Sequence, residues 1–453
     1  MEHPGRRPVD IVILGGGYTA VWGYRSLVRR LRRRIDRGEV RITVVSASRN
    51  HAFHGWTGEV LNGLVRYDRT RTPLGDLMPR ARIVHGRVDA VDLDTRTVIY
   101  RGVGGEGRVP YDHLLVGVGT FDATNRIPGL GEHGWSVKTD GGLIATRAHL
   151  AFVLERAAAC DDDAERSRLR SFVVAGGGFA GVEMAAAIAE LLERRAAGHP
   201  VPAAQRPRVT LVHSGDELLA EVRPRFARIA EYATAQLADL GVEVRFGARV
   251  IEVTAEGAVL HGGELLPAAT VLSTVGQAQV PLAGTERVMR DATGRMVTDP
   301  YLRTSVPGVW TGGDAAAVPH VVSGDPCPPN ALWAIKHGVR VGDNIARAVG
   351  RRRLRRFRFL GLGQAASLGV GRGAAELFGI QLTGWVAWLA RWGFFHFFMP
   401  SRRRTAATIG EWLAIPFRGR YFDDVPASSG PAEVETAAAD TEAAADRTAT
   451  VAA

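Results

Sequence analysis

The chain has 453 residues, 46% of them hydrophobic and 23% charged, which is typical of a globular protein with two or three domains. The net charge of +10 comes almost entirely from arginine, and no nucleic-acid-binding motif accompanies it, so we expect no nucleic-acid partner. The two cysteines, Cys160 and Cys327, lie far apart. This spacing argues against a disulfide framework, a zinc site or an adjacent-dithiol redox centre, and we expect no bound metal.

The N-terminal apolar stretch is a strand rather than a secretory signal. Val9–Leu14 is too short for a signal sequence and continues directly into glycines, so we predict a buried strand and a cytoplasmic location. A helix is expected over about 20–34 and a second strand over 41–45. This β-α-β order is the repeat of a doubly wound parallel sheet.

The same pattern recurs about 160 residues downstream. We predict a strand over 171–175, a glycine turn at 176–178, a helix over 182–195 and a strand over 208–212. The sequence therefore predicts an α/β fold with two Rossmann-like dinucleotide-binding domains.

Each predicted unit carries a glycine-rich turn of the G-x-G-x-x-G/A type between its first strand and its helix. The small residue in the last position of each turn lets the helix pack on the strand. The free N–H groups at the helix N-terminus can bind a diphosphate. Two matches in matching contexts predict two dinucleotide sites. The expected binding residues are Gly15, Gly16, Gly17 and Ala20 in the first turn, and Gly176, Gly178 and Gly181 in the second.

The acidic residue that usually binds the ribose hydroxyls is absent from both units. Ser46 and His213 stand where the second strands end. Ser46 can still hydrogen-bond a ribose hydroxyl. With His213, however, the repulsion that excludes a 2′-phosphate is lost, so the sequence leaves NADH and NADPH open.

Two arginine runs are prominent in the chain. Arg29 to Arg37 is expected to be a solvated face. Arg351 to Arg358 begins the C-terminal part and is expected to face an anionic membrane. Trp385, Trp388 and Trp392 recur at helical spacing within the aromatic segment 383–399, which predicts an interfacial helix. A core helix or a dimer interface remains open for this segment. From about Val425 the composition predicts disorder.

Residues 9–420 resemble the type II NADH:quinone dehydrogenases. Beyond the two glycine turns, the resemblance is carried by Tyr111–Thr120, Ile127–Leu130, Gly176–Glu183 and Val306–Ala316. Two of these segments match the second and third FAD signatures of the wider flavoprotein superfamily. They contribute Gly119 and Thr120, the latter expected at the end of a buried strand, and Gly313 with Asp314, which faces the ribityl chain.

The resemblance implies a complete domain plan. FAD is expected in a split domain, 1–137 plus 285–350, with an NAD(P)H domain, 138–284, inserted in it. Gly276 belongs to the expected cofactor-binding residues. Residues 351–424 form the membrane-associating region. The implied enzyme is peripheral on the cytoplasmic face of the membrane and passes a hydride from NADH or NADPH to flavin N5 and then two electrons to a membrane quinone.

The resemblance also suggests residues for the chemistry. Glu183 matches a glutamate near the nicotinamide–flavin contact, although a carboxylate early in a helix also favours the helix dipole. The expected quinone-site residues are Leu332, Trp333 and Lys336, where the family usually has two glutamines. Lys336 can donate to a quinone oxygen or stabilise the charge of the reduced flavin.

Two other functions stay open. A sulfide:quinone-type enzyme needs reactive cysteines beside the flavin, and Cys160 lies in a charged loop that is a poor place for one. The altered residues Ser46, His213 and Lys336 also fit a redox-responsive flavoprotein that binds NAD(P)H with little turnover. The oligomeric state, including a homodimer, is open as well.

Overall fold

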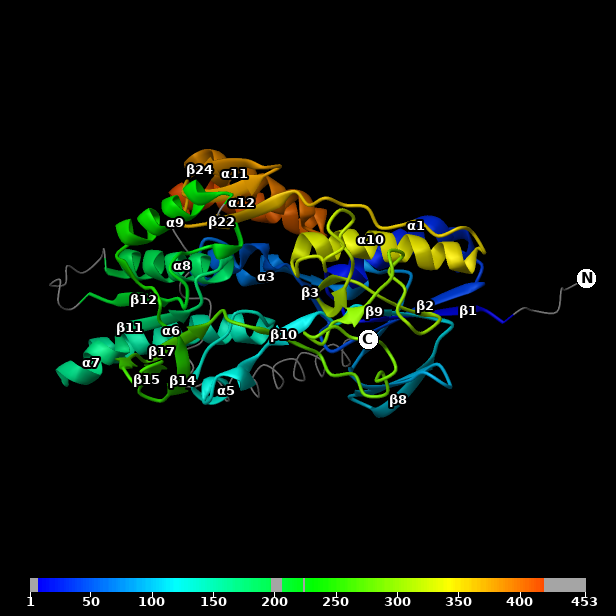
Figure 1. Ribbon diagram of the computed structural model, residues 1–453, viewed down its shortest axis with the longest axis horizontal. Coiled ribbons are helices and arrows are strands. Elements are labelled where there is room, and N and C mark those ends of the chain that lie inside the picture. The colour runs from blue at the N-terminus through cyan, green and yellow to red at the C-terminus, as the bar shows by residue number, and fades with distance from the viewer. Residues whose placement is uncertain (1–6, 197–205, 223–224, 419–453) are drawn as a thin grey trace, which may run out of the picture. The chain divides into compact units, whose positions relative to one another are not determined.

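A computed structural model describes residues 7–196, 206–222 and 225–418 (Figure 1). Its backbone forms two compact units. Unit 1 contains the described residues of 1–52, 71–121 and 278–361, and unit 2 those of 53–70, 122–277 and 362–453. Most of unit 2 is thus inserted in unit 1. The predicted disordered tail, 425–453, lies outside the described residues.

Unit 1 is built on a parallel sheet of five strands in the order β20-β9-β1-β2-β5. Its strands are β1 (Val9–Leu14), β2 (Val40–Ser46), β5 (Arg82–His85), β9 (His113–Val116) and β20 (Val309–Thr311). The expected β-α-β unit is confirmed, because β1 and β2 pair in parallel and α1 (Tyr18–Asp36) connects them.

Successive side chains of β1 point to opposite faces of the sheet, and both faces are covered. Ile11 and Ile13 pack with α1 and with α10 (Ala331–Val349), while Val12 and Leu14 pack against an antiparallel meander on the other face. The two helices approach closely because glycines meet at their contact: a Cβ on Gly338 would lie 2.7 Å from the Thr19 carbonyl oxygen. The remaining elements of unit 1 are short: β3 (Asn50–Ala52), β4 (Arg71–Pro73), α4 (Leu74–Leu77), the meander β6 (Arg87–Asp92), β7 (Thr97–Gly102) and β8 (Gly105–Pro110), β19 (Met296–Val297), η5 (Gly313–Ala315) and β21 (Ala316–Ala317).

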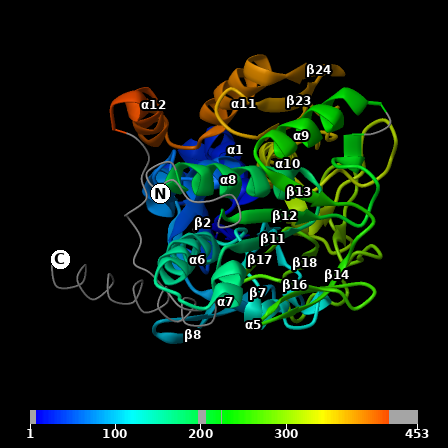
Figure 2. The ribbon, with the colours of Figure 1, turned by 90° about the vertical axis from the view of Figure 1, so that its left-hand side faces the viewer.

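Unit 2 repeats the design with a four-stranded parallel sheet in the order β13-β12-β11-β17. Its strands are β11 (Ser171–Ala175), β12 (Arg208–Val212), β13 (Val242–Arg245) and β17 (Thr270–Ser273). The helices α8 (Phe179–Ala196) and α9 (Ala227–Asp239) lie on one face of this sheet (Figure 2). The meander β14 (Val250–Thr254), β15 (Gly257–Leu260) and β16 (Leu265–Pro267) packs on the other face.

Several further elements complete this part of unit 2. They are η2 (Thr124–Arg126), α5 (Leu130–His133), α6 (Asp140–Ala158), α7 (Asp163–Leu169) and η4 (Ala220–Val222). The chain passes between the two units within β10 (Thr120–Asp122) and again within β18 (Gln277–Gln279).

The C-terminal part of unit 2 is a small α/β layer. An antiparallel meander is followed by two helices: β22 (Gly363–Ser367), β23 (Gly373–Leu377), β24 (Ile380–Thr383), α11 (Gly384–Phe398) and α12 (Arg402–Arg418). None of the helices in the described part of the chain combines the length and the apolar character that crossing a bilayer requires.

One segment departs from the expected domain plan. Residues 53–70, with η1 (His54–Trp56), α2 (Thr57–Leu61) and α3 (Tyr67–Thr70), pack in unit 2, although they interrupt the sequence of unit 1. Trp56 explains this placement, because it is 1% exposed and its ring lies 5.4 Å from that of Phe395 and 5.7 Å from that of Trp412. The expected FAD ranges 1–137 and 285–350 therefore overlap unit 1 without coinciding with it. Which cofactor each unit binds stays a prediction.

Candidate functional site

The first glycine turn has the geometry of a diphosphate cradle. Gly15 follows β1 with a φ of +94°, and a Cβ on it would lie 2.7 Å from the Gly117 carbonyl oxygen. A Cβ on Gly17, by contrast, would meet no atom within 4 Å. Gly17 therefore borders open space at the start of α1, where the free N–H groups of the helix can bind phosphate. The packing of Ala20, which is 0% exposed, fulfils its expected role against the sheet.

The neighbouring polar residues hold this turn in place. Ser46 is 4% exposed, and its hydroxyl accepts a hydrogen bond from the Ser48 amide at 3.3 Å. His51 was not expected at the site, yet its Nδ1 lies 2.9 Å from the Gly16 carbonyl oxygen. Because a carbonyl oxygen only accepts, His51 must carry a proton on Nδ1. The predicted contact of Ser46 with a ribose stays a prediction.

The Gly313–Asp314 turn lies next to the first cradle. A Cβ on Gly313 would collide with the Thr19 hydroxyl, and Thr19 itself donates to the Ala334 carbonyl oxygen at 3.4 Å. A second unexpected histidine, His337, accepts a hydrogen bond from the Gly313 amide through Nδ1 at 3.1 Å. Burial lowers the pKa of His337 to about 3, so this acceptor stays unprotonated.

The structure corrects the expected place of Thr120. The buried strand β9 ends at Val116, and Thr120 instead begins the short strand β10. The intervening glycines cause the break. Gly117 lies against β1, with a Cβ position 3.2 Å from the Leu14 carbonyl oxygen, and Gly119 has a φ of +67°. Both Gly119 and Thr120 still follow the carboxyl end of β9.

The second turn repeats the first with tighter packing. Gly176 has a φ of +111°, and a Cβ there would lie 2.7 Å from the Thr274 hydroxyl oxygen. A Cβ on Gly181 would collide with the Gly176 carbonyl oxygen, which explains why alanine is not found at this position as it is at Ala20. Gly178 accepts the first helical hydrogen bond of α8, from Val182 at 3.0 Å. Gly276, with a φ of +78°, lies beside Ala123 and Arg126.

His213 fastens the second turn. Its Nδ1 accepts a hydrogen bond from the Gly177 amide at 3.2 Å, and a Cβ on Gly177 would lie 2.6 Å from the ring. The imidazole therefore lies beside the glycine turn, directly after the end of β12. The choice between NADH and NADPH at this position stays a prediction.

Glu183 belongs to a buried ion cluster. Its Oε1 accepts a hydrogen bond from the Ser367 amide at 2.8 Å and lies 2.8 Å from Arg391 Nη2. Arg391 Nη1 in turn lies 2.7 Å from Glu59 Oε1. The side chains are 19% exposed for Glu183, 3% for Arg391 and 4% for Glu59. The partners of Glu183 thus come from other segments of the chain, which a role confined to the helix dipole would not require.

Burial and charge act in opposite directions within this cluster. Burial raises the pKa of Glu183, and the nearby Arg391 guanidinium opposes the rise. Burial also disfavours the charged form of Arg391, but Glu183 and Glu59 outweigh it and raise the pKa of Arg391. Arg391 therefore stays a cation, while the pKa of Glu183 is held above its ordinary value.

The expected quinone-site residues lie on the first two turns of α10. Leu332 and Trp333 are buried, at 8% and 6% exposure, and Trp333 packs in the main core of unit 1. The Lys336 ammonium lies 5.2 Å from the centre of the Phe359 ring. Only Lys336 of the three is thus a partly exposed polar group, and a quinone site here stays a prediction.

Both cysteines of the chain are free thiols in the described structure. Burial raises the pKa of Cys327 to about 11, so its thiol is not a nucleophile at neutral pH. Cys160 donates only a weak hydrogen bond to the Asp162 carbonyl oxygen, at 3.5 Å.

Comparisons with known proteins identify the family and the fold. Residues 7–338 match the model of a family described as pyridine nucleotide-disulphide oxidoreductase. An NADH dehydrogenase-like protein of Mycobacterium tuberculosis is 32% identical over 68% of this chain and 72% of its own length. A type II NADH:quinone oxidoreductase of the same species is 27% identical over 90% of this chain and 87% of its own length. The structure of NDH2 from Plasmodium falciparum in complex with NADH superposes with a TM-score of 0.82 at 14% identity, over 92% of this chain and 100% of that one. The predicted resemblance is thereby confirmed.

Proposed function

The chain belongs to the pyridine nucleotide-disulphide oxidoreductase family, and we propose that it is an FAD-dependent NADH:quinone oxidoreductase. In the overall reaction NADH gives up a hydride, and a quinone takes up two electrons and two protons to become a quinol. The observation that carries the proposal is the pair of glycine turns, each opening a helix at the carboxyl end of a parallel sheet. Free thiols at Cys160 and Cys327 mean that no disulfide of this chain relays the electrons.

Unit 1 has the residues to hold FAD. The open space beside Gly17 and the N-terminus of α1 would bind the diphosphate, and the Asp314 carboxylate would accept hydrogen bonds from the ribityl chain. His51 and His337 would keep the two turns in register, since each is hydrogen-bonded to the backbone of one of them. When bound, FAD supplies the two-electron relay between the nicotinamide and the quinone.

Unit 2 has the residues to bind the nicotinamide dinucleotide. The turn from Gly176 to Gly181 would hold its diphosphate, and His213 would border the adenosine ribose. We assign Glu183 to the nicotinamide end, where its carboxyl group can hold or release a proton as the dinucleotide binds and leaves. Lys336, in unit 1, is assigned to the quinone or to the negative charge that develops on reduction.

We further propose that the C-terminal layer binds an anionic membrane surface from the cytoplasmic side. A set of large apolar side chains in the β23–β24 turn, on β24, on α11 and on α12 is more than half exposed to solvent, and we call it the apolar face. Its members are Phe378, Ile380, Trp385, Val386, Leu389, Phe397, Leu413 and Phe417. Exposed apolar side chains in such number are typical of a surface that contacts a partner or a membrane.

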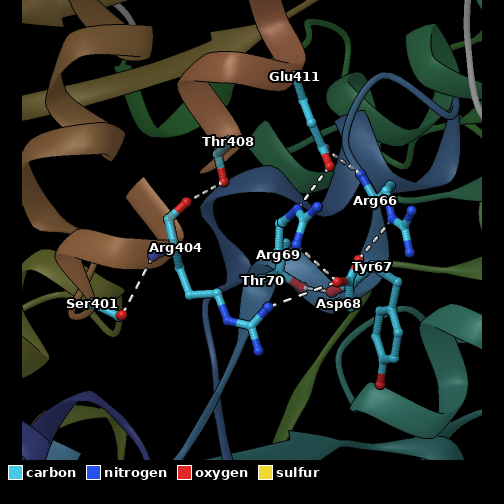
Figure 3. A network of polar contacts seen from close by, with 9 residues as sticks. All are labelled: Arg66, Tyr67, Asp68, Arg69, Thr70, Ser401, Arg404, Thr408 and Glu411. Carbon is cyan, nitrogen blue, oxygen red and sulfur yellow. Dashed lines mark hydrogen bonds and ion pairs between the residues drawn. The ribbon is translucent and has the colours of Figure 1, made fainter. Parts of the chain in front are cut away.

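The network in Figure 3 shows which side of α12 is fixed to the protein and so supports the assignment of its exposed side to the apolar face. Glu411, only 6% exposed, accepts a hydrogen bond from the Arg66 amide at 3.0 Å and one from Arg69 Nε at 2.8 Å. This face of α12 is therefore fixed to the segment 53–70, whereas Leu413 and Phe417 are 70% and 92% exposed. The cationic side chains of Arg402 and Arg403, which begin α12, are exposed and would contact lipid phosphates.

Anaerobic titration tests the proposed reaction. NADH added to the FAD-loaded protein is expected to bleach the flavin absorbance, and a quinone added next is expected to restore it. A parallel titration with NADPH measures the preference that His213 leaves open. A flavin that stays yellow with both dinucleotides contradicts the proposed function.

Replacing Phe397 with glutamate is expected to weaken membrane binding. Phe397 is 81% exposed in the apolar face, and burying such a ring contributes about 1.5–3 kcal/mol, or roughly a tenfold or greater change in affinity. Cosedimentation with vesicles containing anionic phospholipid measures the effect. Val103→Glu is the matched control, because Val103 is 86% exposed but lies in the meander of unit 1. Equal loss in both variants contradicts the assignment of the membrane surface.

A further inference from the structure

Glu59 is a buried carboxylate that no sequence motif marks. It lies in α2, within the segment 53–70, and its side chain is 4% exposed. Its carboxylate contacts one cation, Arg391 of α11, which is separated from it by 332 positions in the sequence. Burying a carboxyl group is costly unless it is paired, and Arg391 supplies that partner for Glu59 in this core.

The contacts show that Glu59 fixes the direction of the Arg391 guanidinium. Nη1 of Arg391 donates to Glu59 at 2.7 Å, and Nη2 donates to the Gly55 carbonyl oxygen at 3.1 Å. Glu59 and Gly55 belong to the same short segment, and both accept hydrogen bonds from the guanidinium. The same Nη2 is thereby presented to Glu183 at 2.8 Å. The Phe395 ring, with its centre 4.4 Å from the guanidinium carbon, supports the group as well.

The charges around Glu183 are few within the described part of the chain. Glu183 contacts the charged group of Arg391 in α11, and Arg391 in turn contacts Glu59 of α2. Strand β22 contributes the Ser367 amide. His396 of α11 is kept neutral because burial lowers its pKa. Glu190, two turns further along α8, accepts a hydrogen bond from Asn62 at 2.9 Å. The Arg391 guanidinium is thus shared by two carboxyl groups, so each is stabilised less by its positive charge than it would be alone.

We propose that Glu59 is a positioning residue for the reaction of this flavoenzyme. Glu59 holds Arg391 in contact with Glu183 and partly neutralises the positive charge of Arg391. Arg391 therefore stabilises the ionised form of Glu183 less strongly, and Glu183 can change its protonation state. This rests on the proposed function only for the role of Glu183 in turnover. The same helix, α11, carries Trp385, Val386, Leu389 and Phe397 of the apolar face. The segment 53–70 therefore connects the proposed membrane helix to the proposed nicotinamide-side carboxylate.

Infrared titration of the buried carboxyl groups tests the proposal without turnover. Glu183→Gln identifies the band that belongs to Glu183. In Glu59→Gln, Arg391 is left to Glu183 alone, and the midpoint of the Glu183 band is expected to fall by about one pH unit. The limb of the NADH kcat/KM profile that disappears in Glu183→Gln should shift by the same amount in the same direction.

Two further variants separate positioning from a general structural effect. Glu190→Gln makes the same chemical change on α8 without touching Arg391, and its Glu183 midpoint is expected to match the wild type. In the double variant Glu59→Gln with Arg391→Gln, Glu183 is buried without a cation, and its midpoint is expected to rise above that of the wild type. If Glu59→Gln does not fold, the double variant still decides: a midpoint at or below the wild-type value overturns the proposal.

The outcomes distinguish this inference from the proposed function. A Glu183 midpoint that is the same in Glu59→Gln and in the wild type overturns the positioning role, even if the wild-type enzyme oxidises NADH normally. A wild-type protein that fails to oxidise NADH contradicts the proposed function, while the infrared midpoints still test the charge sharing within the cluster.

Discussion

The Gly15→Ala variant is expected to be purified without FAD. Gly15 has a φ of +94°, and a Cβ there would lie 2.7 Å from the Gly117 carbonyl oxygen and 3.3 Å from the Val118 Cα. Both neighbours are backbone, so they cannot move aside as a side chain could. The strained conformation costs about 1–3 kcal/mol, and relieving it would displace the N–H groups that we propose bind the diphosphate. A cost of this size corresponds to a loss of roughly five- to 150-fold in FAD affinity.

Visible absorbance of the purified protein and a titration of the apoprotein with FAD measure this loss. Gly38→Ala is the matched control, because Gly38 also has a positive φ, +73°, but a Cβ there would meet no atom within 4 Å. The control is expected to bind FAD as the wild type does, with a small loss of stability from the strained φ alone. A yellow Gly15→Ala protein with full flavin content would place the cofactor elsewhere.

The sequence predicted the strands, glycine turns and helices of both units well because their determinants are local. In each unit a strand of buried residues runs directly into a glycine turn and a helix, and these patterns depend on spacing of a few residues. The predicted strands 9–14, 171–175 and 208–212 match β1, β11 and β12. The resemblance to a known family then predicted the turn at Gly313 and Asp314, which short-range patterns alone would not have joined to the first cradle.

The residues that the sequence did not mark act over long distances in the chain. His51 and His337 have no motif, and each becomes part of the site only because a buried imidazole nitrogen meets a backbone group of a glycine turn. The Thr120 position was wrong for a related reason. The signature segment was expected to form a buried strand that ends at Thr120, but glycines interrupt it, Gly119 takes a φ of +67°, and β9 ends four residues earlier, at Val116.

The aromatic segment 383–399 also shows that local sequence spacing does not reveal long-range contacts. Trp385, Trp388 and Trp392 recur at helical spacing, yet they do not form one exposed stripe. Trp388 is 8% exposed and packs against Trp412 at 5.4 Å between ring centres, whereas Trp385 is 60% exposed. Arg391, in the same segment, is the buried group that joins α11 to the core of unit 2. Its buried partners could not be found from the sequence, because Glu59 and Glu183 come from two distant segments.

The Arg391→Gln variant is expected to lose a large part of the stability of unit 2. It leaves Glu59 and Glu183 facing each other in a buried site without a cation. Removing one partner of a buried ion pair costs about 3–5 kcal/mol. Urea unfolding at neutral pH measures the loss. Adding Glu59→Gln is expected to recover part of it, since one of the two uncompensated carboxylates is then neutral.

Arg245→Gln is the matched control for Arg391→Gln, and pH gives an independent check. Arg245 also bridges two glutamates, Glu243 at 2.7 Å and Glu264 at 3.1 Å, but it is 39% exposed, so its loss should cost at most about 1 kcal/mol. Burial raises the pKa of Glu183 above its ordinary value of 4.5, and removing Arg391 raises it further. The folded variant therefore binds more protons than the unfolded chain, and its stability falls as pH rises through this range. The difference from the wild type should narrow as the pH is lowered toward 4.5, whereas a constant difference would show that Arg391 acts through packing rather than through its charge.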